Sequence, residues 1–205
     1  MSENINHGNT ELSGTDKKLI KNLIIISGPS GTGKDTIAHA LTEKDNSLCI
    51  SVSATTRPMR ANEKEGKDYY FKTEKEFNDL INEDGFIEHA CYDGHCYGTL
   101  KSDVCRRIDE GKQVILVIEV KGAAAVREKF PGVLSIFILP PDMNTLEKRL
   151  RKRATESEES IKKRLAAAND EIMRACEYDY KVVNADLDEA VETVYNIILN
   201  RRKEI

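Results

Sequence analysis

The chain has 205 residues, enough for one domain with a large core, and a net charge of −4 from 31 basic and 35 acidic residues. This balance argues against a general nucleic-acid or membrane surface, so any attraction for anions must be local. No charged and then apolar leader opens the chain, and its apolar runs are far shorter than the roughly 20 residues that span a bilayer. We therefore expect a cytoplasmic protein without a membrane or nucleic-acid partner.

The first 18 residues are polar, rich in Asn, Gly and Ser and without periodicity, which predicts a disordered tail. The five cysteines are odd in number, and Cys91 and Cys96 have neither zinc-knuckle spacing nor a matching second pair. We therefore expect reduced thiols.

Residues 23–36 read LIIISGPSGTGKDT. Their apolar start is typical of a strand buried on both faces of a parallel sheet, and the glycines that follow allow several N–H groups to converge on one anion at the start of a helix. The spacing Gly28-x4-Gly33-Lys34 is that of the nucleoside-triphosphate P-loop, in which Lys34 reaches the β- and γ-phosphates. A glycine-rich turn without a ligand is the alternative. The predicted ATP-binding residues here are Gly28, Pro29, Ser30, Gly31, Thr32, Gly33, Lys34, Asp35 and Thr36.

Strands and helices alternate before residue 53 and again after residue 101. The apolar pattern predicts strands at 23–26, 48–53, 114–120, 134–139 and 180–184. Helices are predicted after Lys34, over 123–128, from residue 142, in a long stretch before residue 180, and at the C-terminal end. This order predicts an α/β fold with a doubly wound parallel sheet, whose ligands bind outside the carboxyl ends of the strands.

The alternation is interrupted between residues 54 and 101. This part contains an aromatic cluster at 69–71, a short helix with a capping box formed by Thr73 and Glu76, and a hairpin signal at residues 93–94. We predict an inserted subdomain over about 54–101, within a core made of residues 19–53 and 102–205.

Residues 147–164 carry dense mixed charge. Such a run is usually a solvated helical face. In a P-loop protein it also fits a mobile lid, over about 147–160, whose arginines close over the triphosphate and neutralise the transferring group. Arg149, Arg153 and Arg164 are the candidate catalytic arginines, beside Lys34.

Several uncommon motifs occur in one order: SVSATTR at 51–57 with Arg60, GKDY at 66–69, FIE at 86–88, YGT at 97–99, FILPP at 137–141, RATESEE at 153–159 and YDY at 178–180. With the P-loop, they make the chain resemble the guanylate kinases from residue 21 to the C-terminal helix. The resemblance implies a P-loop core with an inserted mixed α/β GMP-binding subdomain and a helical lid. It also implies transfer of the γ-phosphoryl group of ATP to GMP, with Mg²⁺, giving ADP and GDP.

Glu88 is similar to the guanine-reading acid of the family, because one carboxylate accepts both adjacent N–H donors of guanine. Each position also has a structural explanation: Glu88 as an exposed strand residue, the tyrosines as packing, and Asn184 as a cap rather than an adenine contact. The residues that match the family's GMP site are Ser53, Arg57, Arg60, Glu63, Tyr69, Glu88, Tyr97, Thr99 and Glu119. Asn184 resembles the residue that meets adenine in ATP.

The chain also departs from the family pattern. Val117 stands where an acid is common two residues before Glu119, and Asn62 and Ala154 replace glycines. Asp35 stands where the P-loop normally has the Ser or Thr that binds Mg²⁺. A carboxylate is an oxygen ligand that Mg²⁺ accepts, but it also brings negative charge near the β-phosphate. We hypothesise that Asp35 ligates Mg²⁺ and shifts the metal dependence without abolishing turnover.

Two other functions remain open at this level. Guanylate-kinase-like domains of scaffold proteins bind peptides without catalysis, and a related kinase could act on another nucleoside monophosphate. Lys34, the three P-loop glycines and the lid arginines favour an enzyme. Glu88 favours GMP, together with the residues that match the family's clamp on the GMP phosphate: Arg57, Arg60, Tyr69 and Tyr97.

Overall fold

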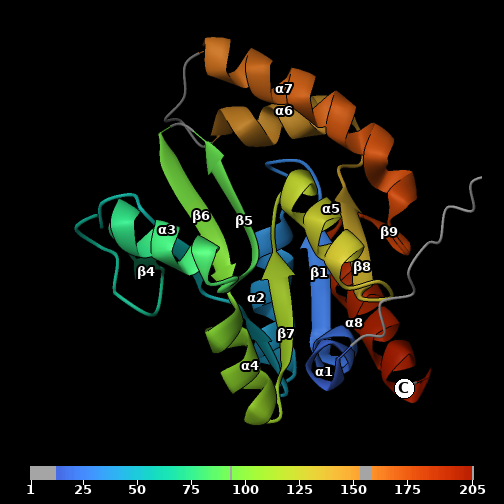
Figure 1. The fold of residues 1–205 in the computed structure, drawn as a ribbon. Coiled ribbons are helices and arrows are strands. Elements are labelled where there is room, and N and C mark those ends of the chain that lie inside the picture. Colours follow the sequence, from blue (N-terminus) through green and yellow to red (C-terminus); the bar gives the residue numbers. More distant parts are fainter. Residues whose placement is uncertain (1–12, 93, 153–157, 205) are drawn as a thin grey trace, which may run out of the picture.

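The computed structural model describes residues 13–92, 94–152 and 158–204 (Figure 1). At its centre is a five-stranded sheet in the order β2-β7-β1-β8-β9, and every neighbouring pair in it is parallel. Its strands are β1 (Leu23–Ser27), β2 (Leu48–Ile50), β7 (Gln113–Val117), β8 (Leu134–Leu139) and β9 (Tyr180–Val183). The predicted doubly wound parallel core is therefore confirmed.

Strand β1 is buried along its whole length because helices cover both faces of the sheet. Leu23 and Ile25 belong to one apolar cluster, and Ile24 and Ile26 to another, as the two-residue period of a strand requires. The first cluster includes residues of α1 (Gly14–Asn22), α4 (Lys101–Asp109) and α5 (Val120–Lys129); the second includes residues of α2 (Lys34–Lys44) and α8 (Leu187–Glu204).

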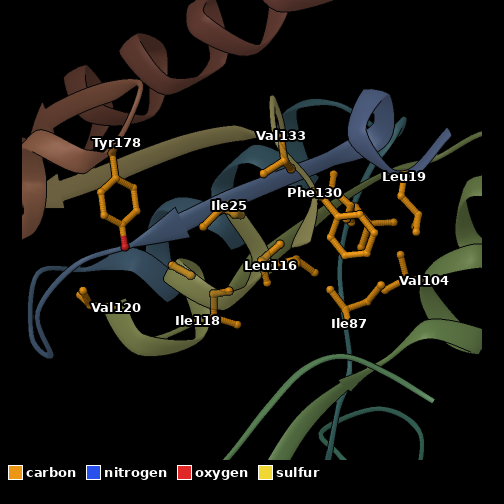
Figure 2. Close-up of a cluster of buried hydrophobic side chains, with 14 of the residues drawn as sticks. Leu19, Ile25, Ile87, Val104, Leu116, Ile118, Val120, Phe130, Val133 and Tyr178 are labelled. Carbon is orange, nitrogen blue, oxygen red and sulfur yellow. The ribbon is translucent and has the colours of Figure 1, made fainter. Parts of the chain in front are cut away.

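Figure 2 shows the first cluster, in which Ile25 and Leu116 of the sheet lie near Phe130 and Ile118. Each such side chain, when fully buried, contributes about 1.5–3 kcal/mol of hydrophobic free energy, so this layer fixes the sheet against its helices.

Two further helices lie beyond the carboxyl ends of β1 and β7: α6 (Met143–Lys152) and α7 (Glu158–Met173) (Figure 1). A short 3-10 helix, η1 (Arg174–Glu177), follows α7. None of the described helices is long and apolar enough to cross a bilayer.

The residues between 53 and 100 form a second, mixed sheet in the order β4-β3-β6-β5. Its strands are β3 (Ser53–Thr55), β4 (Tyr70–Phe71), β5 (Phe86–Tyr92) and β6 (His95–Leu100), and α3 (Glu74–Asn82) packs on it through the buried Phe77. The capping box of Thr73 and Glu76 begins α3 as predicted. The predicted hairpin joins β5 and β6, and its last pair is Tyr92 with His95.

The single strand predicted at 48–53 is wrong, because this segment belongs to two sheets. Ile50 is the last residue of β2 and pairs with Ile115 in the parallel sheet, whereas Ser53 pairs with Thr99 in the second sheet. No Gly, Pro or charged residue separates the two strands, so the sequence has no turn signal at the change of partner.

The disordered tail predicted over 1–18 is wrong for residues 14–18, which lie in α1. The Ser13 side chain accepts a hydrogen bond from the Asp16 N–H, and the Asp16 carboxylate accepts one from the Ser13 N–H. This capping box satisfies N–H groups at the start of the helix, and Leu19 anchors the helix in the core.

The expectation of reduced thiols is wrong for Cys91 and Cys96, which form a disulfide across the β5–β6 hairpin. The two residues are direct partners in register. The Cys96 N–H and C=O both bond to Thr56 on the opposite side, so Cys91 and Cys96 are a non-hydrogen-bonded pair, the kind whose side chains lie closest. Cys49, Cys105 and Cys176 are free thiols.

The capping box of α1 gives a test of this helix. We expect Ser13→Ala to lower the free energy of unfolding by about 1 kcal/mol, because Ala cannot accept the hydrogen bond from Asp16. Urea unfolding measures the change, and Ser13→Thr, which keeps the hydroxyl, is the matched control. Equal stability of Ser13→Ala and the parent would show that the capping box adds nothing to the stability of the fold.

Candidate active site

The P-loop follows β1 and leads directly into α2. Gly28, Gly31 and Gly33 have φ angles of 135°, 89° and 91°, in the left-handed region that favours glycine. A Cβ atom on Gly28 would lie 2.3 Å from the Ile138 carbonyl oxygen, and one on Gly33 would lie 2.4 Å from Asn184 Nδ2. Neither position accepts a side chain, so the loop is held in one shape against the ends of neighbouring strands.

Asn184 supports the loop from behind. It is buried, and its Nδ2 donates to the Thr32 carbonyl oxygen at 2.7 Å. The backbone carbonyl oxygen of Asn184 accepts a hydrogen bond from Arg149 Nη2 at 3.0 Å. In this structure the Asn184 side chain therefore contacts the P-loop backbone, and its contact with adenine stays a prediction.

The cationic groups of the site surround the same loop. Lys34 Nζ donates to the carbonyl oxygens of Gly28 and Pro29, at 2.6 and 2.9 Å, and Arg164 Nη1 donates to Ser30 Oγ at 3.5 Å. Arg149 Nη1 is buried and has no hydrogen-bond partner in the described part of the chain. Arg153, the third predicted lid arginine, lies outside the described residues. Lys34, Arg149 and Arg164 thus place three positive charges around one phosphate-sized loop.

The second sheet carries a separate cationic group at Arg57. Its guanidinium donates to both carboxylate oxygens of Glu63, at 3.0 and 2.7 Å, and lies 5.3 Å from the centre of the Tyr69 ring. The Tyr69 and Tyr97 rings meet edge to face at 6.2 Å. Arg60 donates its backbone N–H to Glu63. Four of the predicted phosphate-clamp residues therefore lie together, and Glu63 at present neutralises Arg57.

Glu88 is a partly buried acid on β5. Its Oε1 accepts from Thr99 Oγ1 at 2.8 Å, and a Cβ atom on Gly122 would lie 2.9 Å from its Oε2. Burial raises the pKa of Glu88, and Glu119 raises it further, whereas the hydrogen bonds from Thr99 lower it. One oxygen is thus held by Thr99, and the other faces the start of α5, where Glu119 is the N-cap residue.

Two adjoining cavities connect these groups. One of about 400 Å³ is lined by predicted GMP-site residues together with Val117 and Glu171. Another, of about 480 Å³, is lined by Asp35, Ser53, Tyr69 and Val117. Because they share Ser53, Tyr69 and Val117, the cavities join the first turn of α2 to the second sheet. The predicted residues that line the first are Ser53, Tyr69, Glu88, Tyr97 and Glu119.

A model of the family described as "Guanylate kinase" matches residues 20–201. This chain belongs to the guanylate kinase family. It is 51% identical to the guanylate kinase of Caldanaerobacter subterraneus subsp. tengcongensis, over 86% of each chain, and 47% identical to that of Synechocystis sp., over 86% of this chain and 92% of the relative. The crystal structure of guanylate kinase from Anaplasma phagocytophilum has a TM-score of 0.68 and 36% identity, over 88% of this chain and 85% of that one.

These comparisons confirm the predicted family, its P-loop α/β fold and the assignment as an ATP:GMP phosphotransferase. They do not test the individual guanylate kinase site residues, whose roles stay predictions. Among the described residues, no group of three or more His, Cys, Asp or Glu side chains is arranged to hold a metal ion.

The sequence did not predict Glu171 of α7 as a site residue. In the structure it lines the cavity of about 400 Å³, together with residues of the second sheet. Glu171 lies seven residues after Arg164, and residues seven apart share one face of a helix. That spacing puts Glu171 on the face of α7 that carries Arg164, and the structure brings this end of the face to the cavity.

The raised pKa of Glu88 predicts a pH-dependent stability. Because the folded state binds this proton more tightly than the unfolded state, whose pKa is 4.5, stability is lost as pH rises through the folded pKa. Gln at this position cannot ionise but can still accept from Thr99. We expect Glu88→Gln to be more stable than the parent at about pH 8, with no gain at about pH 3. Urea unfolding at both pH values checks this, with the exposed Glu128→Gln as control; a gain of equal size at both would contradict it.

Proposed function

We propose that three groups of residues carry out the transfer of the γ-phosphoryl group from ATP to GMP. They are a donor site, an acceptor site and the lid arginines. The observation that carries the proposal is the joining of the P-loop helix to the cavity around Glu88 through shared lining residues. This arrangement offers one path between a triphosphate on the loop and a nucleotide in the cavity.

On the donor side, the P-loop and Lys34 hold the ATP phosphates, and Arg149 and Arg164 neutralise the charge of the transferring group. The buried, unpartnered Nη1 of Arg149 supports this role, since a buried donor without a partner is costly and a phosphate oxygen would satisfy it. We assign Arg153 to the same group from the sequence alone.

On the acceptor side, Glu88 accepts the two N–H groups of the guanine edge, with Ser53 and Thr99 beside it. Arg57, Arg60, Tyr69 and Tyr97 bind the GMP phosphate, which displaces Glu63 from Arg57 because both are anions that match the guanidinium fork. The attacking oxygen already belongs to an ionised phosphate, so the reaction needs positioning and charge neutralisation rather than a strong base.

The magnesium ion that we propose as cofactor would be held by Asp35. Its carboxylate lies in the first turn of α2, lines the cavity between the two sites, and accepts no hydrogen bond from the described residues. Oxygen ligands of this kind suit Mg²⁺, which supplies charge neutralisation between ATP phosphates when bound. Glu119, at the same end of the sheet, is a second carboxylate that could orient its water ligands.

We also propose that the second sheet, about 54–101, and the lid, about 147–160, close on the parallel sheet when both nucleotides are bound. Closure excludes water from the phosphoryl group and brings GMP into line. The family's nucleotide substrates support a cytoplasmic location, and the acidic net charge supports the absence of a nucleic-acid partner.

Release of ADP in a coupled assay tests the function. With ATP and Mg²⁺ we expect turnover with GMP and little with AMP, CMP or UMP. Lys34→Ala should lower kcat by about 100-fold or more while leaving GMP binding, measured by calorimetry, near the parental value. Protein that binds GMP but turns over none of the acceptors would instead support the interaction-module alternative.

The role of Asp35 is tested by Asp35→Ser. We expect the half-saturating Mg²⁺ concentration to shift, with kcat at saturating Mg²⁺ within about 10-fold of the parent, because a hydroxyl replaces a charged ligand. Calorimetry of ATP binding at several Mg²⁺ concentrations gives a second readout. Asp188→Ser changes an exposed acid in the first turn of another helix and is the control. Unchanged metal dependence and rate would refute the hypothesis.

A further inference from the structure

Glu171 is a half-buried acid that the donor and acceptor roles do not use. It lies on α7 and lines the cavity of about 400 Å³ that also contains Glu88, Glu119, Tyr69 and Tyr97. Glu88 and Tyr97 come from the second sheet and Tyr69 directly precedes β4, so Glu171 brings α7 into the lining of the same cavity.

The surroundings of Glu171 are unfavourable for a carboxylate. Within the described part of the chain it forms no hydrogen bond and no ion pair. Burial raises its pKa, the charge of Lys34 lowers it, and the charge of Glu119 raises it. A half-buried carboxylate beside another acid costs free energy unless it gains hydrogen-bond donors. A molecule that enters the cavity can supply such donors.

The acceptor nucleotide offers donors of only two kinds. Its phosphate is an anion, which a carboxylate repels, and the N–H groups of its base are the proposed partners of Glu88. The remaining donors are the 2′- and 3′-hydroxyl groups of the ribose, which lies between base and phosphate. In the cavity, the corresponding space lies between Glu88 and the Tyr69–Tyr97 pair, and Glu171 completes its wall.

We propose that Glu171 accepts a hydrogen bond from a ribose hydroxyl of the acceptor nucleotide and so favours ribonucleotides over their deoxy counterparts. The inference rests on the proposed function, because it takes GMP as the acceptor. Glu171 is then a specificity-determining residue on α7, the helix that also carries Arg164. The C-terminal part of this helix contacts the ribose, and the part around Arg164 faces the phosphates.

The test compares GMP, 2′-deoxy-GMP and 3′-deoxy-GMP on the parent, Glu171→Ala and Glu171→Gln. We expect the parent to lose about 10-fold in kcat/KM with one deoxy acceptor. Glu171→Ala should lose about 10-fold with GMP and nothing further with that deoxy acceptor, while KM for ATP stays unchanged. Glu171→Gln, which can still accept a hydrogen bond, should fall between. Asp170→Asn makes a matched charge change at an exposed neighbour on α7 and should behave like the parent.

Two results would overturn the inference. An equal loss with GMP and both deoxy acceptors would show that Glu171 does not read the ribose. A raised KM for ATP with unchanged GMP kinetics would show that Glu171 acts through Lys34 instead. Calorimetric binding of GMP and the deoxy analogues gives the same comparison without turnover, so failure of the proposed function, seen as an inactive parent, is distinguished from failure of this inference.

Discussion

The central constraint on this structure is that β1 is buried on both faces and paired on both edges. A strand in that position can present functional groups only at its end, and β1 ends at the P-loop. The ends of β8 and β9 limit the room around the loop. The Ile138 carbonyl oxygen and Asn184 occupy the space that side chains at Gly28 and Gly33 would need. The glycines are therefore required twice, once for backbone conformation and once for room. The shape of the predicted phosphate site therefore follows from how closely the ends of the parallel strands approach the loop.

The sequence predicts what is local or periodic. The P-loop, the capping box at Thr73 and the hairpin before His95 depend on neighbouring residues, and the alternating strands and helices show in the apolar pattern. The failures depend on pairing or on a signal that composition hid. Cys91 and Cys96 become neighbours only when the register of the hairpin is known, and no Gly, Pro or charged residue marks the point where β2 gives way to β3. The residues of the capping box at Ser13 are present in the sequence, but the polar composition of the first 18 residues favoured the prediction of disorder.

The site residues divide in the same way. Lys34 and Glu88 stand in motifs whose chemistry can be derived from spacing or from the pattern of guanine donors. Glu171 belongs to no motif, and its place beside the acceptor cavity follows from the path of α7 across the sheet. The pairing of Arg57 with Glu63 also requires the structure, because the two residues are six positions apart in a loop. Long-range packing, rather than residue type, determines these positions.

The candidate site takes charged residues from both sheets. The cavity beside the second sheet is lined by Glu88 of β5 and, from the core, by Glu119 and Glu171. Arg57 follows β3, and in this structure Glu63 neutralises its charge. The chain passes between the sheets only at residues 51–52 and again after Leu100, so the clamp and the P-loop are linked by few covalent connections. Under the proposed closure, the second sheet binds the GMP phosphate while the P-loop cations bind the ATP phosphates, so each surface neutralises the anion that the other brings near it.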